Sequence, residues 1–203
     1  MKCRSFSFLP LAALFLLTVA VVNAETVSNA ADFMRVFESA DEESMGKDVF
    51  LDGDIDFSSM SNIAPLGLNK NNKCTPYRGK LQGNGYSLKG LTIDQSGNTQ
   101  YPHAGLFCRL DGAVIENVVL DESCKMTGSD SGALAVVVTG SVTLMNVKSQ
   151  ATVTGTGNVG GLFARVESSS ESSFVFDHCV VEEYLSSTGA SAGGFVGVLR
   201  SSN

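Results

Sequence analysis

The sequence has few of the residues and spacings that signal a catalytic or metal-binding protein. Among its 203 residues there are only two histidines and no Cys-x-x-Cys pair. A zinc site or a redox dithiol needs such groups close together, so we expect neither. No Asn-x-Ser/Thr sequence occurs, so N-linked glycosylation is not expected. We therefore predict neither a metal ion nor a cofactor.

Long hydrophobic runs are also scarce, because only one is present and it lies at the start of the chain. Lys2 and Arg4 precede an almost wholly apolar segment, residues 11–22, and a small-residue cleavage site ends at Ala24. This pattern is typical of a secretory signal peptide over residues 1–24, with an uncleaved N-terminal anchor as the alternative. The run is short for a bilayer span, and no second run follows. We expect a secreted or cell-surface protein without membrane insertion.

Basic residues are scarce in the rest of the chain. After residue 24 there are 12 Lys and Arg against 21 Asp and Glu, a net charge of −9. A negative surface of this size repels nucleic acid and anionic lipid head groups, so neither is an expected partner. Only 17% of all residues are charged whereas 43% are hydrophobic. This composition favours a folded chain over a disordered one.

The second half of the chain contains a repeated phrase. A Gly-led apolar triplet recurs at spacings of 27, 29 and 33 residues, and a second triplet ending in Asn or His follows the first three copies. The first set is Gly105-Leu106-Phe107, Gly132-Ala133-Leu134, Gly161-Leu162-Phe163 and Gly194-Phe195-Val196, and the second set is Ile115-Glu116-Asn117, Leu144-Met145-Asn146 and Phe176-Asp177-His178. Self-similarity at this period indicates a solenoid, in which each unit buries its apolar face only against its neighbours.

The short segments between turn residues predict how the units stack. Each unit is expected to hold two or three strands of about four to six residues, which pair in parallel with the strands of the units above and below. Two columns of equivalent residues follow from this stacking, an apolar one inside and a polar one at a turn. They consist of Leu106, Leu134 and Leu162, and of Asn117, Asn146 and His178, respectively. The side-chain amides of the polar column are expected to bond along it.

An amphipathic helix is predicted over residues 25–40, capped by Ser28 or Asn29. Its core-facing side consists of Phe33, Val36 and Phe37. Such a helix covers the open end of a solenoid, where apolar surface and unpaired strand edges otherwise meet water. We expect residues 25–60 to form this cap and a first strand, and residues 61–203 to form the solenoid, with its last unit incomplete.

The first strand carries acidic residues that resemble the start of a calcium loop. Asp52, Asp54 and Asp56 have the right spacing, but Phe57 stands where a calcium loop requires Gly. The alternation of Asp54 and Asp56 with Ile55 and Phe57 is instead typical of a strand with one face in water. Calcium binding is therefore not predicted.

Four cysteines follow the signal peptide, which permits two disulfides in three pairings. They are Cys74, Cys108, Cys124 and Cys179. The sequence leaves open a bond from Cys74 to either Cys108 or Cys124, and it leaves open free thiols packed in the core. Cys179 aligns with Val118 and Val147 of the neighbouring units, so we expect it in an apolar slot.

Two stretches resemble the GLUG-type repeats of bacterial and protist surface and secreted proteins. Tyr77 to Ile93, with the tight turn Gly83-Asn84-Gly85, is similar to the phrase that precedes such repeats, and Gly105 to Leu120 and its later copies are similar to the repeats themselves. The resemblance implies an all-β, right-handed parallel β-helix of the pectate-lyase-like class with an adhesive or displayed role. The sequence departs from the pattern at Cys108, at His178 and in an insertion over residues 167–172.

Parallel β-helices of this class include polysaccharide lyases and hydrolases, so an enzymatic function is an alternative. Glu116 and Asp177 occupy equivalent positions two units apart, with Met145 between them, and are the only candidate catalytic pair that we name. Their expected separation is roughly 10 Å, and ordinary solvated strand positions explain them better. The favoured hypothesis is a non-enzymatic β-solenoid that binds a glycan or a surface protein. The alternatives are a polysaccharide lyase or glycoside hydrolase, and a structural fragment of a larger surface protein that associates end to end.

Overall fold

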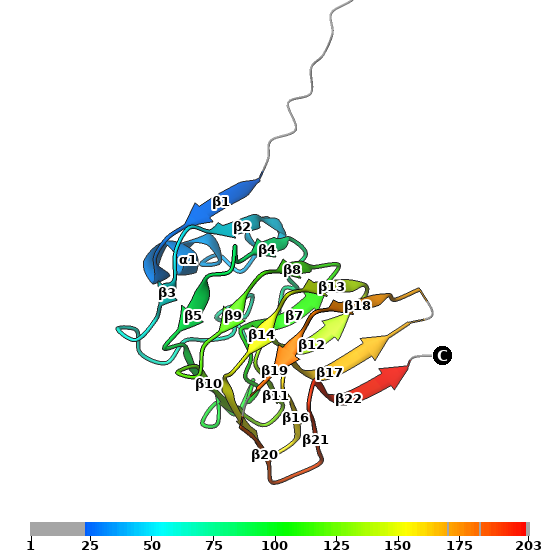
Figure 1. The fold of residues 1–203 in the computed structure, drawn as a ribbon. Coiled ribbons are helices and arrows are strands. Elements are labelled where there is room, and N and C mark those ends of the chain that lie inside the picture. Colours follow the sequence, from blue (N-terminus) through cyan, green and yellow to red (C-terminus); the bar gives the residue numbers. More distant parts are fainter. Residues whose placement is uncertain (1–22, 170, 183, 202–203) are drawn as a thin grey trace, which may run out of the picture.

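The structure is a computed structural model that describes residues 23–169, 171–182 and 184–201. The predicted signal peptide falls on residues 1–24, and all of it up to residue 22 lies outside the described residues. Within them, nearly all regular structure is β, with one α-helix and one short 3₁₀ segment near the N-terminus. The strands form about five stacked turns of a parallel β-solenoid (Figure 1).

The N-terminal cap and the five turns follow one another along the chain. The cap consists of β1 (Ala24–Val27), α1 (Ala30–Val36) and a 3₁₀ segment (Ser44–Gly46). The first turn has β2 (Asp48–Leu51) and β3 (Ile55–Asp56), and the second has β4 (Lys80–Gln82), β5 (Ser87–Lys89), β6 (Thr92–Asp94) and β7 (Phe107–Asp111). The third turn has β8 (Val114–Glu116), β9 (Val119–Leu120), β10 (Lys125–Gly128), β11 (Ser131–Gly132) and β12 (Ala135–Thr139). The fourth has β13 (Val142–Met145), β14 (Lys148–Ser149), β15 (Thr152–Gly155), β16 (Asn158–Gly160) and β17 (Phe163–Ser168), and the fifth has β18 (Phe174–Asp177), β19 (Val180–Val181), β20 (Leu185–Ser187), β21 (Ser191–Gly193) and β22 (Val196–Ser201).

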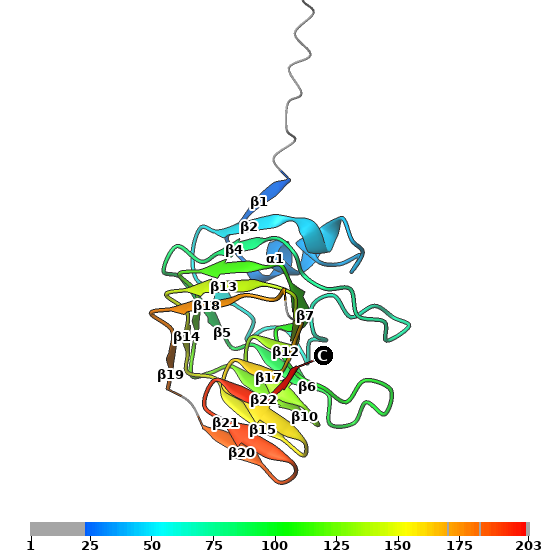
Figure 2. The ribbon, with the colours of Figure 1, turned by 90° about the vertical axis from the view of Figure 1, so that its right-hand side faces the viewer.

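Equivalent strands of successive turns pair in parallel and build five sheets along the axis (Figure 2). Their orders are β1-β2-β4-β8-β13-β18, β3-β5-β9-β14-β19, β6-β10-β15-β20, β11-β16-β21 and β7-β12-β17-β22. We call them the six-stranded sheet, the five-stranded sheet, the β6 sheet, the three-stranded sheet and the β7 sheet. The prediction of parallel stacking is confirmed, but a full turn has five short strands rather than two or three. The difference arises because Gly, Asn and Ser bend the chain at more corners than the apolar runs reveal.

The predicted apolar column lies inside the solenoid. Leu106, Leu134 and Leu162 are at most 1% exposed. The N–H of Leu134 donates to the carbonyl of Leu162 at 2.9 Å, and the N–H of Phe107 donates to the carbonyl of Leu134 at the same distance. These bonds place the three leucines in adjacent layers, as predicted.

The glycine alignment of the last two triplets, in the fourth and fifth turns, was wrong by one residue. Gly132 pairs with Gly160, and not with Gly161 as the triplets implied. These glycines lie at a corner where backbone crowds them, since a Cβ on Gly160 would stand 2.0 Å from the carbonyl oxygen of Phe163. The glycine column therefore marks a close approach of strands that no side chain permits.

The predicted polar column is present at the corner between the six-stranded and five-stranded sheets. Asn84, Asn117, Asn146 and His178 all have φ between 51° and 54°. The amide of Asn146 donates to Asn117 Oδ1 at 2.9 Å, and the amide of Asn117 donates to Gln82 Oε1 at 2.9 Å. Asn tolerates the left-handed conformation better than most residues, and its amide adds a bond along the column.

The N-terminal cap differs in part from the prediction. The helix covers only Ala30–Val36, because residues 24–27 form β1 and pair in parallel with β2. Asn29 is the cap residue, since its Oδ1 accepts the N–H of Asp32 at 2.9 Å. Phe33 lies edge-on to Phe57, and Phe37 lies edge-on to Phe107, at centroid distances of 5.6 and 5.9 Å. Aromatic rings from the helix thus close this end of the core, as expected.

The opposite end of the solenoid has no such cover in the described residues. Seven large hydrophobic side chains are exposed, and all but Tyr86 belong to the fifth turn. They are Val175, Phe176, Val180, Tyr184, Phe195 and Leu199. This surface, which we call the fifth-turn edge, combines apolar side chains with unpaired strand edges.

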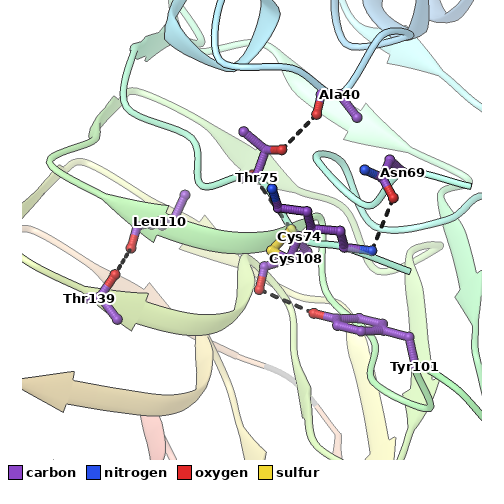
Figure 3. Close-up of a disulfide and its surroundings, with 9 residues drawn as sticks. Ala40, Asn69, Cys74, Thr75, Tyr101, Cys108, Leu110 and Thr139 are labelled. Atoms are coloured by element: carbon purple, nitrogen blue, oxygen red, sulfur yellow. Dashed lines mark hydrogen bonds between the residues drawn. A yellow bond between two sulfur atoms is a disulfide. The ribbon is translucent and has the colours of Figure 1, made fainter. Parts of the chain in front are cut away.

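One disulfide is formed among the described residues, and it is one of the two pairings that the sequence left open. Cys74 bonds to Cys108 and so fastens the irregular segment of residues 58–76 to β7 (Figure 3). Beside it, the hydroxyl of Thr75 donates to the carbonyl of Ala40 at 2.7 Å. Cys124 and Cys179 are free thiols. Burial raises the pKa of Cys124 to about 11, which keeps that thiol protonated and unreactive.

Cys179 occupies the slot predicted for it. It follows His178 as Val118 follows Asn117 and Val147 follows Asn146, and both valines are fully buried. Cys179 itself packs against the core but is partly exposed, because no turn of the described residues lies below the fifth. Burial raises the pKa of this thiol as well.

Replacing Asn146 by alanine should lower the free energy of unfolding by about 1–3 kcal/mol. The left-handed conformation costs up to about 1–2 kcal/mol more for alanine than for asparagine, whose side chain can hydrogen-bond locally, and the lost amide bond adds about 1 kcal/mol. Asn146→Gly is the matched control, because glycine accepts the conformation and loses only the amide. Urea unfolding of the wild type, Asn146→Ala and Asn146→Gly measures the conformational cost and the cost of the lost amide bond. Equal costs for alanine and glycine would contradict a conformational role for this column.

Candidate functional site

The two acids named as a catalytic pair lie on the outer face of the six-stranded sheet. Glu116 and Asp177 pair with Met145 from opposite sides, so two strand spacings of about 4.8 Å separate their backbones. Glu116 Oε2 accepts Lys80 Nζ at 2.7 Å and Gln82 Nε2 at 2.9 Å. Asp177 lies against His178 Nδ1 at 2.6 Å. Each acid is held by its own neighbours, and the Met145 thioether lies between them.

Asp54 and Asp56, whose spacing resembles a calcium loop, instead stabilise the turns of the chain. Asp54 forms an ion pair with Lys89 at 2.6 Å, and a side-chain hydrogen bond from that ammonium is the main reason that the pKa of Asp54 is lowered. Asp56 accepts the N–H of Ser58 at 2.8 Å. Hydrogen bonds to the serine two residues on also lower the pKa of Asp94 and of Asp121. These carboxylates close Asx turns between strands.

A more concentrated group of polar side chains lies where residues 95–104 connect β6 to β7. This segment runs beside β10 and β11, since the N–H of Gln95 donates to the carbonyl of Thr127 and the N–H of Ala104 donates to that of Asp130. Tyr101 donates its hydroxyl to the carbonyl of Cys108 at 3.4 Å (Figure 3). Its ring stands edge-on to His103 with 5.1 Å between centroids.

We call this group the Tyr101 corner. It consists of Tyr101, His103, Arg109, Asp130 and Arg165. Arg109 and Arg165 project from β7 and β17 and pair with Val137 of β12 from either side. The corner therefore joins three consecutive turns of the solenoid to the connecting segment.

Asp130 is the centre of a polar ladder along the three-stranded sheet. Its Oδ1 accepts the backbone N–H and the side-chain amide of Asn158 at 2.8 and 2.9 Å, and its Oδ2 meets Arg165 at 3.3 Å. Its own N–H donates to His103 Nδ1 at 3.3 Å. One turn further, Ser191 Oγ donates to Asn158 Oδ1 at 2.9 Å. Four turns are thus connected by side chains as well as by backbone.

The local field of the corner keeps His103 neutral and Tyr101 protonated. Burial lowers the pKa of His103, and the positive charge of Arg165 lowers it further, while Asp130 opposes both. Burial raises the pKa of Tyr101 to about 12, against the lowering effect of the Arg109 and Arg165 charges. Since His103 Nδ1 accepts a backbone N–H, the proton of the neutral ring is on Nε2.

This arrangement suits binding better than proton transfer. A general base of the triad type needs Nε2 free to accept and Nδ1–H held by an acid, which is the opposite tautomer. Asp130 has both oxygens engaged by donors. What the corner offers to a ligand are donors, namely Nε2–H of His103 and the two guanidinium groups.

The sequence analysis named none of these five residues as a candidate site residue. A signal was present, because each unit has a polar residue two positions before its column glycine. These pairs are His103 and Gly105, Asp130 and Gly132, Asn158 and Gly160, and Ser191 and Gly193. The alignment of the Gly-led triplets hid this pattern, because it was off by one residue in the third and fourth copies.

Residues 189–193 match the spacing of a serine-hydrolase nucleophile elbow, Gly-x-Ser-x-Gly. Ser191 is the serine of that segment, but it lies in β21, which pairs in parallel with β16. Its hydroxyl donates within the ladder to Asn158, and not to a histidine. An elbow requires a sharp turn between a strand and a helix. The match is therefore a consequence of the glycine column and the polar ladder.

The described part of the chain was compared with the geometry of a metal site and of a membrane-spanning helix, and it has neither. No group of three or more His, Cys, Asp or Glu side chains there is arranged to hold a metal ion. No helix there is both long and apolar enough to cross a bilayer.

A segment of 92 residues is 41% identical to halomucin from Haloquadratum walsbyi (strain DSM 16790 / HBSQ001). The similarity covers 45% of this chain but only 1% of halomucin, so the chain spans a very small part of that relative. No family model matches the chain. No solved structure matches it either.

The stability of the fold should decrease between pH 7.5 and pH 5.5 in a way that depends on His103. Its pKa in the folded protein is below the ordinary value of about 6.5. The unfolded chain therefore takes up a proton first, and stability present above that pH is lost as the pH falls toward the folded pKa.

Urea unfolding at both pH values, for the wild type and His103→Gln, measures this contribution. The variant should lose part of the pH dependence. His178→Gln, which removes the exposed histidine, should keep it. An unchanged slope in His103→Gln would show that the histidine is not held neutral by the corner.

Proposed function

We propose that this protein is a secreted or cell-surface β-solenoid that acts by contact with a glycan or a protein, and not by catalysis. The observation that carries the proposal is the polar ladder of the Tyr101 corner, where stacked strands hold His103, Asp130 and Arg165 in fixed positions. Binding groups on stacked strands are held in place at no further ordering cost. Export through a signal peptide over residues 1–24 is part of the proposal.

Two resemblances support a surface role. The similarity to halomucin is consistent with display outside the cell. The GLUG-type phrase of Tyr77 to Ile93 and the repeats after it point in the same direction. Neither names a ligand, so the proposal rests on the geometry of the solenoid for its mode of action.

The geometry of Glu116 and Asp177 argues against the rival, a polysaccharide lyase or hydrolase. Inverting hydrolases hold their carboxyl groups about 6.5–9.5 Å apart with a water between them. Here the Met145 side chain occupies the intermediate strand position, and Glu116 is engaged by Lys80 and Gln82. An acid that already accepts two strong donors is poorly placed to give a proton to a leaving group.

Incubating the chain from residue 25 with pectins, alginates and neutral glycans tests this choice. We expect no release of reducing or unsaturated ends. We expect retention of at least one glycan or cell-surface preparation on beads that carry the protein. Glu116→Gln and Asp177→Asn should leave that retention unchanged. Turnover that is lost in either variant would overturn the contact role in favour of an enzyme.

A second candidate role is assembly through the fifth-turn edge. Tyr184 and Leu199 are 67% and 68% exposed there, and the strand edges beside them have no partner in the described residues. Because α1 and its aromatic residues cover the other end, two copies meet only edge to edge, which gives a closed pair instead of a filament. In a longer protein the same edge would receive a further turn.

Sedimentation velocity at increasing protein concentration tests the assembly role. The wild type should form dimers, and the double variant Tyr184→Lys, Leu199→Lys should remain monomeric, because facing charges repel and the apolar contact is lost. Tyr86→Lys changes the one exposed large hydrophobic residue outside the edge and should not affect the dimer. A wild type that stays monomeric, or that forms filaments, would contradict a closed pair.

A further inference from the structure

Arg109 is the cation of this protein whose surroundings are hardest to explain without a ligand. Among the described residues no carboxylate forms an ion pair with it, and its buried Nε has no hydrogen-bond acceptor. The other Lys and Arg residues without an ion pair lie on exposed positions, where water solvates them. They are Lys70, Lys73, Lys125 and Arg200. A half-buried guanidinium without an acceptor is costly, because hydrogen bonds to a charged group are worth more than neutral ones.

Arg165, two strands away, is in a similar environment. Its buried Nε also has no acceptor, although its terminal nitrogen contacts Asp130 at 3.3 Å. The backbones of Arg109 and Arg165 are about 9.6 Å apart, with Val137 on the strand between them. Both side chains act on the same point, since the charges of both lower the pKa of Tyr101. Both side chains also lie on one face of the β7 sheet, because Arg109, Val137 and Arg165 occupy one register column.

The charges at this point sum to a positive site on an acidic protein. Asp130 is offset by Arg165 and by two donors from Asn158. His103 is held neutral and presents Nε2–H as a donor. Arg109 is then left without a counter-charge. The corner offers donors from several directions and one unbalanced positive charge.

We propose that Arg109 and Arg165 form a subsite for an oxyanion, a carboxylate or sulfate group carried by the contact partner. A guanidinium binds two oxygens of such a group through parallel N–H donors, and Nε–H is one of that pair. Arg109 has no carboxylate partner among the described residues, and an oxyanion at its guanidinium group supplies the missing counter-charge. The subsite deepens the proposed contact function, because it names the chemical group recognised at the Tyr101 corner.

The test is a titration followed in ¹H–¹⁵N spectra of the arginine Nε–H groups, using the chain from residue 25. Sodium sulfate and sodium acetate are the two probes, and sodium chloride at matched ionic strength is the control. We expect saturable shifts of the Arg109 and Arg165 signals with sulfate, with acetate or with both, and none with chloride. The comparison of the two anions identifies the preferred group.

Two variants separate binding from folding. Arg109→Lys keeps the charge but loses the paired donors, and it should weaken the response at Arg165 at least tenfold while the backbone amide spectrum stays native. Arg78→Lys, at an arginine already paired with Glu42 and Asp111, should leave the response unchanged. Shifts that follow ionic strength alone, or that persist in Arg109→Lys, would overturn the subsite.

The outcome is distinguishable from that of the bead assay. Saturable anion shifts without retention of any surface preparation would leave the subsite intact and reject the contact function. Retention without anion shifts would support the contact function and reject the subsite. The anion titration needs no knowledge of the natural partner, because the readout is on the two arginines themselves.

Discussion

Every feature of this protein depends on hydrogen bonding between a strand and its equivalent one turn away. The strands are two to six residues long, and their backbone groups are satisfied by the turns on either side. The same pairing places equivalent side chains directly above one another. A column then has to be uniformly apolar inside, as at Leu134 and Leu162, or uniformly small where strands crowd, as at Gly132 and Gly160.

That dependence on neighbours makes the two ends different from the middle. At the N-terminal end, β1 adds one more strand to the six-stranded sheet, and the aromatic residues of α1 cover the layer below it. At the other end the fifth turn has the same strands but no cover in the described residues, and residues equivalent to buried ones become exposed. Phe195, for example, follows Leu162 in its column but is 39% exposed. The end of a solenoid is where burial and pairing fail together.

Stacking also decides what the polar residues do. Carboxylates that look available in the sequence are used to connect turns, as Glu116 is with Lys80 and Gln82, or to close them, as Asp56 is with Ser58. The exception is the Tyr101 corner, where the ladder through Asp130 leaves donors without acceptors. In a repeated frame of this kind most of these polar side chains are held by neighbouring turns, so the surface is rigid. Contact with a partner is the role that we propose for such a surface.

The solenoid, the layers of Leu106, Leu134 and Leu162, the turn column from Asn117 to His178, and the aromatic cap could all be predicted from the amino-acid sequence. These follow from periodicity and turn chemistry, which are local properties. The number of sheets, the choice of Cys108 as the partner of Cys74, and the Tyr101 corner could not be predicted in this way. The disulfide and the corner bring together residues about 30 or more positions apart, and their distances depend on where each corner bends. Those positions are set when the turns stack, because a shift of one residue at a glycine changes which side chains share a column.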